Sequence, residues 1–164
     1  MNEVSVNKQA MLSPHFSLGE MTKTSYHPLD GNIPSRVHIE NMINLCENWL
    51  EELRFSYNTL YCLDPGEDYE TSEDVEPIII NSGFRSPDTN QLCGGATHSN
   101  HLTGCAVDIH CAGKEQAIRY ACILLDIADG KKQDFDELIL EKRGTTIWVH
   151  FAVRPRGNRR YVDF

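Results

Sequence analysis

An acidic residue, Asp108, interrupts the apolar segment 105–111, whose alternating pattern predicts a strand. Val107 and Ile109 share the face expected to pack in the core, so Asp108 points to the opposite face, towards a cleft or solvent. Burying an unpaired charge in an apolar strand is costly, so this carboxylate is a candidate for chemistry rather than for packing. His101 lies at the end of the glycine-rich loop before it.

A second apolar segment, residues 146–153, also predicts a strand and contains His150. Alternation separates His150 from Ile147, Val149 and Phe151. If the two strands pair, His150 and Asp108 converge. With His101 they form a set of three zinc ligands whose fourth position is open to water, which is typical of catalytic zinc. Such an ion lowers the pKa of water towards about 7 and polarises a carbonyl group.

The residues alone leave other interpretations open. Each histidine also fits a hydrogen-bonded surface or core residue. A rival metal hypothesis is a closed structural zinc built from one short stretch, whose spacings fit no zinc-finger pattern well: Cys93, His98, His101 and Cys105.

The elements that would position these residues follow from periodicity and turn signals. Ser17 and Glu20 predict a capped helical turn over 16–21, and apolar spacing predicts helices over 36–55 and 114–128, the latter ending at Gly130. A short helix is expected over 87–92. Strands are expected over 76–81, 105–111, 135–141 and 146–153, the last two as a hairpin. We therefore predict an α+β fold, with a small, mainly antiparallel sheet and helices packed on one side.

The 164 residues fit one domain, with a loose lead-in over 1–15 and the folded domain over 16–164. The net charge of −9 argues against a nucleic-acid partner. The acidic stretch 64–76 and the basic stretch 154–160 are both expected to be solvated surface.

No apolar run reaches the length of a membrane span, and residues 1–10 have no apolar signal-peptide core. Most or all of the six cysteines are expected to be reduced thiols.

The motif Ser99-x-His101-x-x-Gly104-x-Ala106-x-Asp108, followed by Trp148-Val-His150, resembles the zinc D-Ala-D-Ala carboxypeptidase and L-Ala-D-Glu endopeptidase family of peptidoglycan enzymes. Four further segments resemble family segments in the same order: 16–21, 80–87, the Gly94-Gly95 loop and 135–141. The similarity spans roughly residues 16–153 and is greatest to the short, phage-associated branch. The resemblance implies the hedgehog/D-Ala-D-Ala peptidase-like fold and one Zn²⁺ ion bound by His101, Asp108 and His150.

One position departs from the family pattern. Many members have a catalytic Glu three residues before the last zinc histidine, and this chain has Ile147 there. Glu141, at the end of the preceding strand, is our candidate for the general base, and Glu137, on the same face of that strand by parity, is the second choice. Arg85 is a candidate catalytic and substrate-binding residue for a carboxylate or a developing oxyanion. Ser99 is expected either to bind substrate or to stabilise the loop.

These residues lead to the hypothesis of a zinc peptidase that cuts peptidoglycan stem peptides, for example as a phage or prophage endolysin. We expect a monomer made in the cytoplasm that reaches the wall after holin action or lysis. The alternative hypothesis is a zinc-binding but non-catalytic module that holds wall peptide, for example in a virion. Ile147 in place of the usual Glu motivates that alternative.

Overall fold

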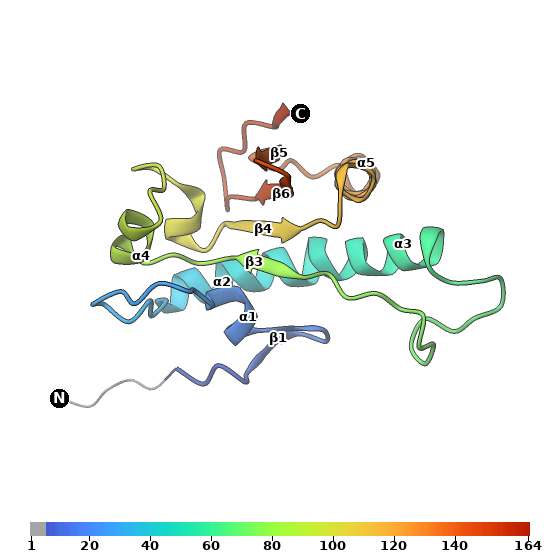
Figure 1. Cartoon of the computed structure of the whole chain (residues 1–164), viewed down its shortest axis with the longest axis horizontal. Helices are drawn as coiled ribbons and strands as arrows, with labels where there is room; N and C mark the ends of the chain where they lie inside the picture. The colour runs from blue at the N-terminus through green and yellow to red at the C-terminus, as the bar shows by residue number, and fades with distance from the viewer. Residues whose placement is uncertain (1–5) are drawn as a thin grey trace.

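The computed structural model describes residues 6–164, in which helices pack against a five-stranded sheet (Figure 1). A small antiparallel hairpin contains β1 (Met11–Ser13) and β2 (Phe16–Ser17). The main sheet has the strand order β3-β4-β6-β5-β7, with bounds Ile80–Ser82, Ala106–His110, Thr146–Ala152, Glu137–Arg143 and Tyr161–Asp163. Its pairings are antiparallel except between β5 and β7, which run parallel. The predicted α+β class with a mainly antiparallel sheet is confirmed.

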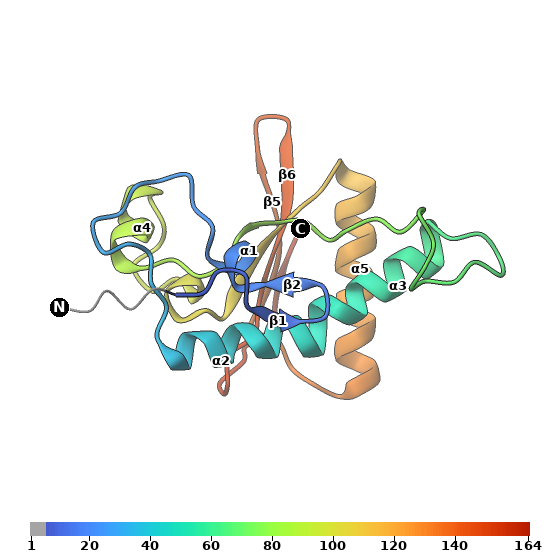
Figure 2. The ribbon, with the colours of Figure 1, turned by 90° about the horizontal axis from the view of Figure 1, so that it is seen from below.

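Two long helical stretches cover one face of this sheet. The first joins α2 (Arg36–Leu45), a π-helical turn η1 (Cys46–Leu50) and α3 (Glu51–Tyr61), and the second is α5 (Lys114–Lys131). Figure 2 shows the first stretch crossing the strands while α5 runs alongside them. Trp49 of η1 lies 5.0 Å from the ring of Phe151, and both are buried. The opposite face of the sheet is therefore left for polar side chains.

Three short helices complete the fold: α1 (Leu18–Thr22), α4 (Pro87–Leu92) and the 3₁₀ turn η2 (Asn100–Thr103). The predicted capping box is present, because Ser17 Oγ accepts from the Glu20 backbone N–H while the Glu20 carboxylate accepts from the Ser17 backbone N–H. Pro87 opens α4 as expected.

The first long helix continues to Tyr61 rather than ending at Phe55. The π-helical turn adds one residue to a turn and shifts the phase of the buried face, so Tyr57 and Asn58 are buried beyond the predicted end. The Asn58 side chain then binds both the N–H and the carbonyl of Glu76. Those backbone groups are held by a side chain instead of a strand, and β3 starts at Ile80, not at Glu76.

Other boundaries also differ from the sequence-based expectations. Residues 1–5 of the expected lead-in lie outside the described residues, while 11–13 form β1, so the predicted boundary at residue 16 divides a hairpin. Glu51 fixes that hairpin, because its carboxylate accepts from Ser13 Oγ and from the His15 backbone N–H. The helix α5 runs through Gly130, and its left-handed C-cap is Lys132.

Candidate metal centre

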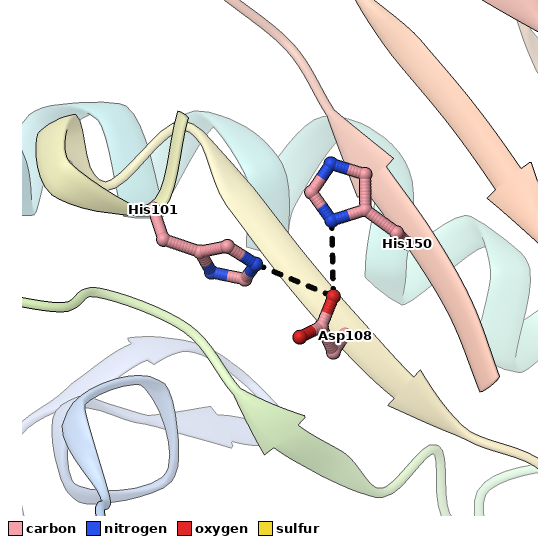
Figure 3. Close-up of side chains that lie close together, drawn as sticks. All are labelled: His101, Asp108 and His150. Carbon is pink, nitrogen blue, oxygen red and sulfur yellow. Dashed lines mark hydrogen bonds and ion pairs between the residues drawn. The ribbon is translucent and has the colours of Figure 1, made fainter. Parts of the chain in front are cut away.

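Three side chains converge on the open face of the sheet: His101 from η2, Asp108 from β4 and His150 from β6 (Figure 3). Asp108 Oδ1 lies 3.3 Å from His101 Nε2 and 3.0 Å from His150 Nδ1. One potential ligand atom from each residue lies within 4.8 Å of the others. All three residues are buried. Two imidazole nitrogens and one carboxylate oxygen are a donor set typical of a three-ligand zinc site.

The sheet register and one glycine explain this convergence. Asp108 and His150 are directly paired across β4 and β6, so their side chains leave the same face. His101 reaches them because Gly104 ends η2 in a left-handed conformation (φ 72°), which turns the chain straight into β4. A Cβ atom at Gly104 would also lie 2.5 Å from the His38 carbonyl oxygen.

In both imidazole rings, the nitrogen that faces away from Asp108 makes a hydrogen bond to an oxygen acceptor, as is usual for metal-binding histidines. His101 Nδ1 donates to the Gly83 carbonyl at 2.7 Å, which leaves Nε2 facing Asp108. His150 Nε2 donates to Glu137 Oε1 at 3.2 Å, which leaves Nδ1 facing Asp108. The inner nitrogens are therefore free to donate a lone pair to a metal ion. This arrangement fits a zinc ion bound by His101 Nε2, His150 Nδ1 and the Asp108 carboxylate.

The electrostatics of the site favour a cation. Burial alone would lower the pKa of His150, but the carboxylates of Asp108 and Glu137 outweigh it and raise that pKa to about 9. Burial alone would raise the pKa of Asp108, and the hydrogen bonds from both histidines instead bring it well below its usual range. A bound divalent ion would replace the His150 proton as the positive charge between the rings.

The three residues lie in a pocket of about 580 Å³ on the open face of the sheet. Arg85, Ser99 and Glu141 all border it. Arg85 Nη2 lies 3.1 Å from Asp108 Oδ2, and Arg85 Nε donates to Ser82 Oγ at 3.0 Å. Arg85 Nη1 is beside Gly95, where a Cβ atom would lie 3.2 Å from it. The guanidinium group is thus next to the ligand carboxylate, with one nitrogen on the side of the Gly94-Gly95 loop.

The other predicted site residues differ in how directly they contact the three converging side chains. Ser99 is the N-cap of η2, where its hydroxyl accepts from the His101 backbone N–H at 3.2 Å. Glu141 borders the pocket and pairs with Trp148 across the hairpin, whereas Ile139 pairs with His150. Glu137 contacts His150 directly, so the second-choice base is the one in contact with a proposed zinc ligand.

Position 147 does not face the pocket. The strand β6 is regular, so residues 146, 148, 150 and 152 share one face and Ile147 lies on the other, in the hydrophobic core. A carboxylate three residues before His150 would therefore point away from the three converging side chains. In this chain β6 therefore offers no carboxylate to the pocket from position 147, and β5 is the neighbouring source of carboxylates.

The rival zinc hypothesis is not supported. Within residues 6–164, the group His101, Asp108 and His150 is the one that brings three metal-binding side chains together, and Cys93, His98 and Cys105 form no such group with His101. All six cysteines are free thiols, which agrees with the expectation of reduced cysteines.

Two features of the site were not predicted. The basic stretch 154–160 is not simply solvated surface, because Arg159 binds the fully buried carboxylate of Asp136 through Nε and Nη2 at 3.0 and 2.9 Å. Asn100 also binds Asp136, through Nδ2 at 2.8 Å. Asn100 directly precedes His101, and Asp136 directly precedes Glu137. This adjacency to candidate site residues was the one signal in the sequence that could have pointed to Asn100 and Asp136.

Comparison with known proteins agrees with this geometry. The family model described as Peptidase M15 matches residues 14–139, which include His101 and Asp108; His150 and Glu141 follow the matched segment. A search of curated proteins gives no match. No helix among residues 6–164 is both long enough and apolar enough to cross a bilayer. Because the family match covers most of the chain, the protein belongs to the Peptidase M15 family of zinc metallopeptidases.

Proposed function

We propose that this protein hydrolyses a peptide bond in the stem peptides of bacterial peptidoglycan, with one zinc ion bound by His101, Asp108 and His150. The observation that carries the proposal is the convergence of these three ligand atoms in a pocket large enough for a peptide segment. Family membership supports peptide hydrolysis as the reaction class. The ion would supply Lewis acidity, which polarises the scissile carbonyl and makes water a better nucleophile.

The protein's own residues would supply proton transfer and orientation. Glu141 borders the pocket and lies two residues beyond Ile139, the residue paired with His150, on the same face of β5, so it is our candidate to take a proton from the attacking water. The same carboxyl would then protonate the leaving amine. Arg85, with Nη1 towards the Gly94-Gly95 loop, is our candidate to bind a substrate carboxylate or the developing oxyanion. We assign Ser99 to loop capping and substrate contact together.

The pocket combines the carboxylates of Asp108, Glu137 and Glu141 with arginines that can bind the carboxylates of a peptide. Four arginines border the pocket, although the whole chain has a net charge of −9: Arg85, Arg143, Arg154 and Arg159. Positive side chains around a pocket raise the local concentration of anionic ligands. Stem peptides carry free carboxylates, so their ends complement this border.

The test is mass spectrometry of purified peptidoglycan incubated with the protein, with and without a chelator. The expected result is new amino and carboxyl ends that appear with zinc and disappear with the chelator. The masses of the fragments identify the bond, and so distinguish an endopeptidase from a carboxypeptidase. Zinc binding without new ends from any wall preparation would contradict the proposal and support the non-catalytic wall-binding alternative.

We further propose a biological role as a phage or prophage endolysin that reaches the wall after holin action or lysis. The resemblance of its motifs to the phage-associated branch supports this role. Expression in the cytoplasm of a wall-bearing host, with and without a co-expressed holin, tests it. Lysis is expected when both are present, and equal lysis without the holin would contradict the proposed route to the wall.

A further inference from the structure

Glu137, the first residue of β5, makes the closest carboxylate contact to the metal centre apart from Asp108. Its Oε1 lies 3.2 Å from His150 Nε2, the ring nitrogen that faces away from Asp108. The side chain is largely buried, with 20% of its surface exposed. A carboxylate behind a metal-binding imidazole fixes the orientation of the ring and directs the other nitrogen towards the metal.

The Glu137 carboxylate is itself fixed by two other segments. Asn100 Nδ2 donates to Oε1 at 2.5 Å, and Arg159 Nη2 lies 3.3 Å from Oε2. The same Arg159 also donates two hydrogen bonds to the fully buried Asp136, so its guanidinium group is anchored by two neighbouring carboxylates although 54% of the Arg159 side chain is exposed. Arg154 Nε donates to Asn100 Oδ1 at 2.9 Å and holds that amide in turn. The segment after β6 therefore reaches the metal centre through Arg159 and Glu137.

This environment distinguishes Glu137 from Glu141. Glu137 Oε1 already accepts from His150 and Asn100, and its other oxygen faces Arg159. Among the described residues, the Glu141 side chain has no hydrogen bond or ion pair, and it borders the pocket. A general base needs a lone pair that faces the reacting water, whereas an orienting carboxylate needs fixed partners.

We infer that Glu137 is a positioning residue of the zinc site: it holds the His150 ring with Nδ1 towards Asp108, and Arg159 of the segment after β6 holds Glu137 in place. This inference rests on the proposed zinc ligands and goes beyond them, because it adds two residues that touch neither the metal nor the reacting bond. It also assigns different tasks to the two carboxylates on one face of β5.

The test measures zinc affinity by competition with a chromophoric chelator, in the full-length protein and without substrate. Glu137→Ala should weaken zinc binding by about 10- to 100-fold, the usual effect of losing such a partner. Glu137→Gln should weaken it less, because the amide oxygen can still accept from His150. Glu141→Gln is the matched control on the same strand face and should bind zinc as tightly as the unchanged protein.

A second readout separates positioning from general loss of structure. The visible absorption spectrum of the cobalt-loaded protein reports ligand geometry, and it should change in Glu137→Ala while remaining unchanged in Glu141→Gln. If Glu137→Ala does not fold, Glu137→Gln and Arg159→Met carry the same test, and both should weaken zinc binding.

The outcomes are separable from those for the proposed function. If the unchanged protein binds no zinc, the proposed zinc site fails. If it binds zinc and Glu137→Ala binds equally well with the same cobalt spectrum, only the positioning inference fails. A third outcome would also overturn the inference. If Glu137→Ala binds zinc with full affinity but no longer cleaves the peptide, while Glu141→Gln still cleaves it, Glu137 is the base.

Discussion

At the scale of single residues, the site depends on which atom of each side chain already makes a hydrogen bond to a neighbour. His101 and His150 each use their outer nitrogen for an oxygen acceptor, Gly83 and Glu137 respectively, and turn the inner one towards Asp108. Arg85 reaches the other Asp108 oxygen. Each proposed zinc ligand therefore has a neighbour that limits its rotation, which is the condition for a preorganised metal site.

Glu141→Gln should lower the rate of peptide hydrolysis by about two to four orders of magnitude while zinc binding is retained. The amide keeps the size of the side chain but cannot take a proton from water. The measurement is the turnover of a stem-peptide substrate alongside zinc content. Glu115→Gln, which changes an exposed residue in the first turn of α5, is the control and should be fully active. Normal turnover by Glu141→Gln would rule out this residue as the base.

At the scale of elements, the alternation of β6 decides where a carboxylate can act. Position 147 belongs to the core face together with Val149 and Phe151, and His150 belongs to the pocket face. The neighbouring strand β5 presents Glu137, Ile139 and Glu141 to the pocket. The carboxylates that face the pocket therefore come from β5, because position 147 of β6 faces the core.

Ile147→Glu should not restore the family pattern. The new carboxylate would enter the core, at a cost of about 2–3 kcal/mol in the free energy of unfolding. The double variant Ile147→Glu, Glu141→Gln should stay inactive. Urea unfolding and turnover assays check both statements, with Thr145→Glu, in the exposed hairpin turn, as the stability control. Recovered turnover in the double variant would show that position 147 can reach the reacting bond.

The contact between β3 and α1 also controls the metal centre. Gly83, directly after β3, packs so closely on α1 that a Cβ atom would lie 2.3 Å from the Met21 carbonyl oxygen, and the Gly83 carbonyl holds His101. Gly83→Ala should therefore cost about 1–3 kcal/mol of stability and also weaken zinc binding. Gly113→Ala, where no atom lies within 4 Å of the new Cβ, is the control. Unchanged zinc affinity in a destabilised Gly83→Ala would separate the two effects.

Sequence patterns predicted what depends on local periodicity. Alternation placed Asp108 and His150 each on the face of its strand away from the core, and the pairing of β4 with β6 brings them together. The capping residues located α1, and Pro87 located α4. Such local patterns could not predict contacts between segments that are distant in the sequence. The pairing of Arg159 with Asp136 and the parallel pairing of β7 with β5 depend on how the chain returns after β6. The π-helical turn was also missed, because one added residue breaks the 3.6-residue period used to trace the helix.

At the scale of the whole molecule, a buried charge network joins the end of the described chain to the centre of the sheet. Asp136 is fully buried and is bound by Arg159, Asn100 and Arg154. Burial alone would raise the pKa of Asp136, but these hydrogen bonds and charges outweigh it and lower the pKa from 3.8 to about 2. The ionised form therefore stabilises the fold.

This shift predicts how stability depends on pH. The contribution of Asp136, about 2 kcal/mol from the size of the shift, is complete above pH about 4 and is lost as the pH falls towards about 2. Between those values the unfolded chain binds the proton more readily than the folded protein does. Urea unfolding of the metal-free protein and of Asp136→Asn should show a large difference near neutral pH and a smaller one near pH 3. An equal difference at both pH values would contradict the prediction.

The strand β7 also has a protective consequence. It pairs with the first three residues of β5, Glu137 to Ile139, on the side of β5 that would otherwise be an open edge of the sheet. Exposed edge strands add strands from other molecules, and this is a common start of aggregation. Proteolysis after Val153 would therefore do two things at once: it would remove Arg159 from Asp136 and Glu137, and it would leave β5 open to self-association. Loss of metal affinity and loss of solubility should then occur together in the cleaved protein.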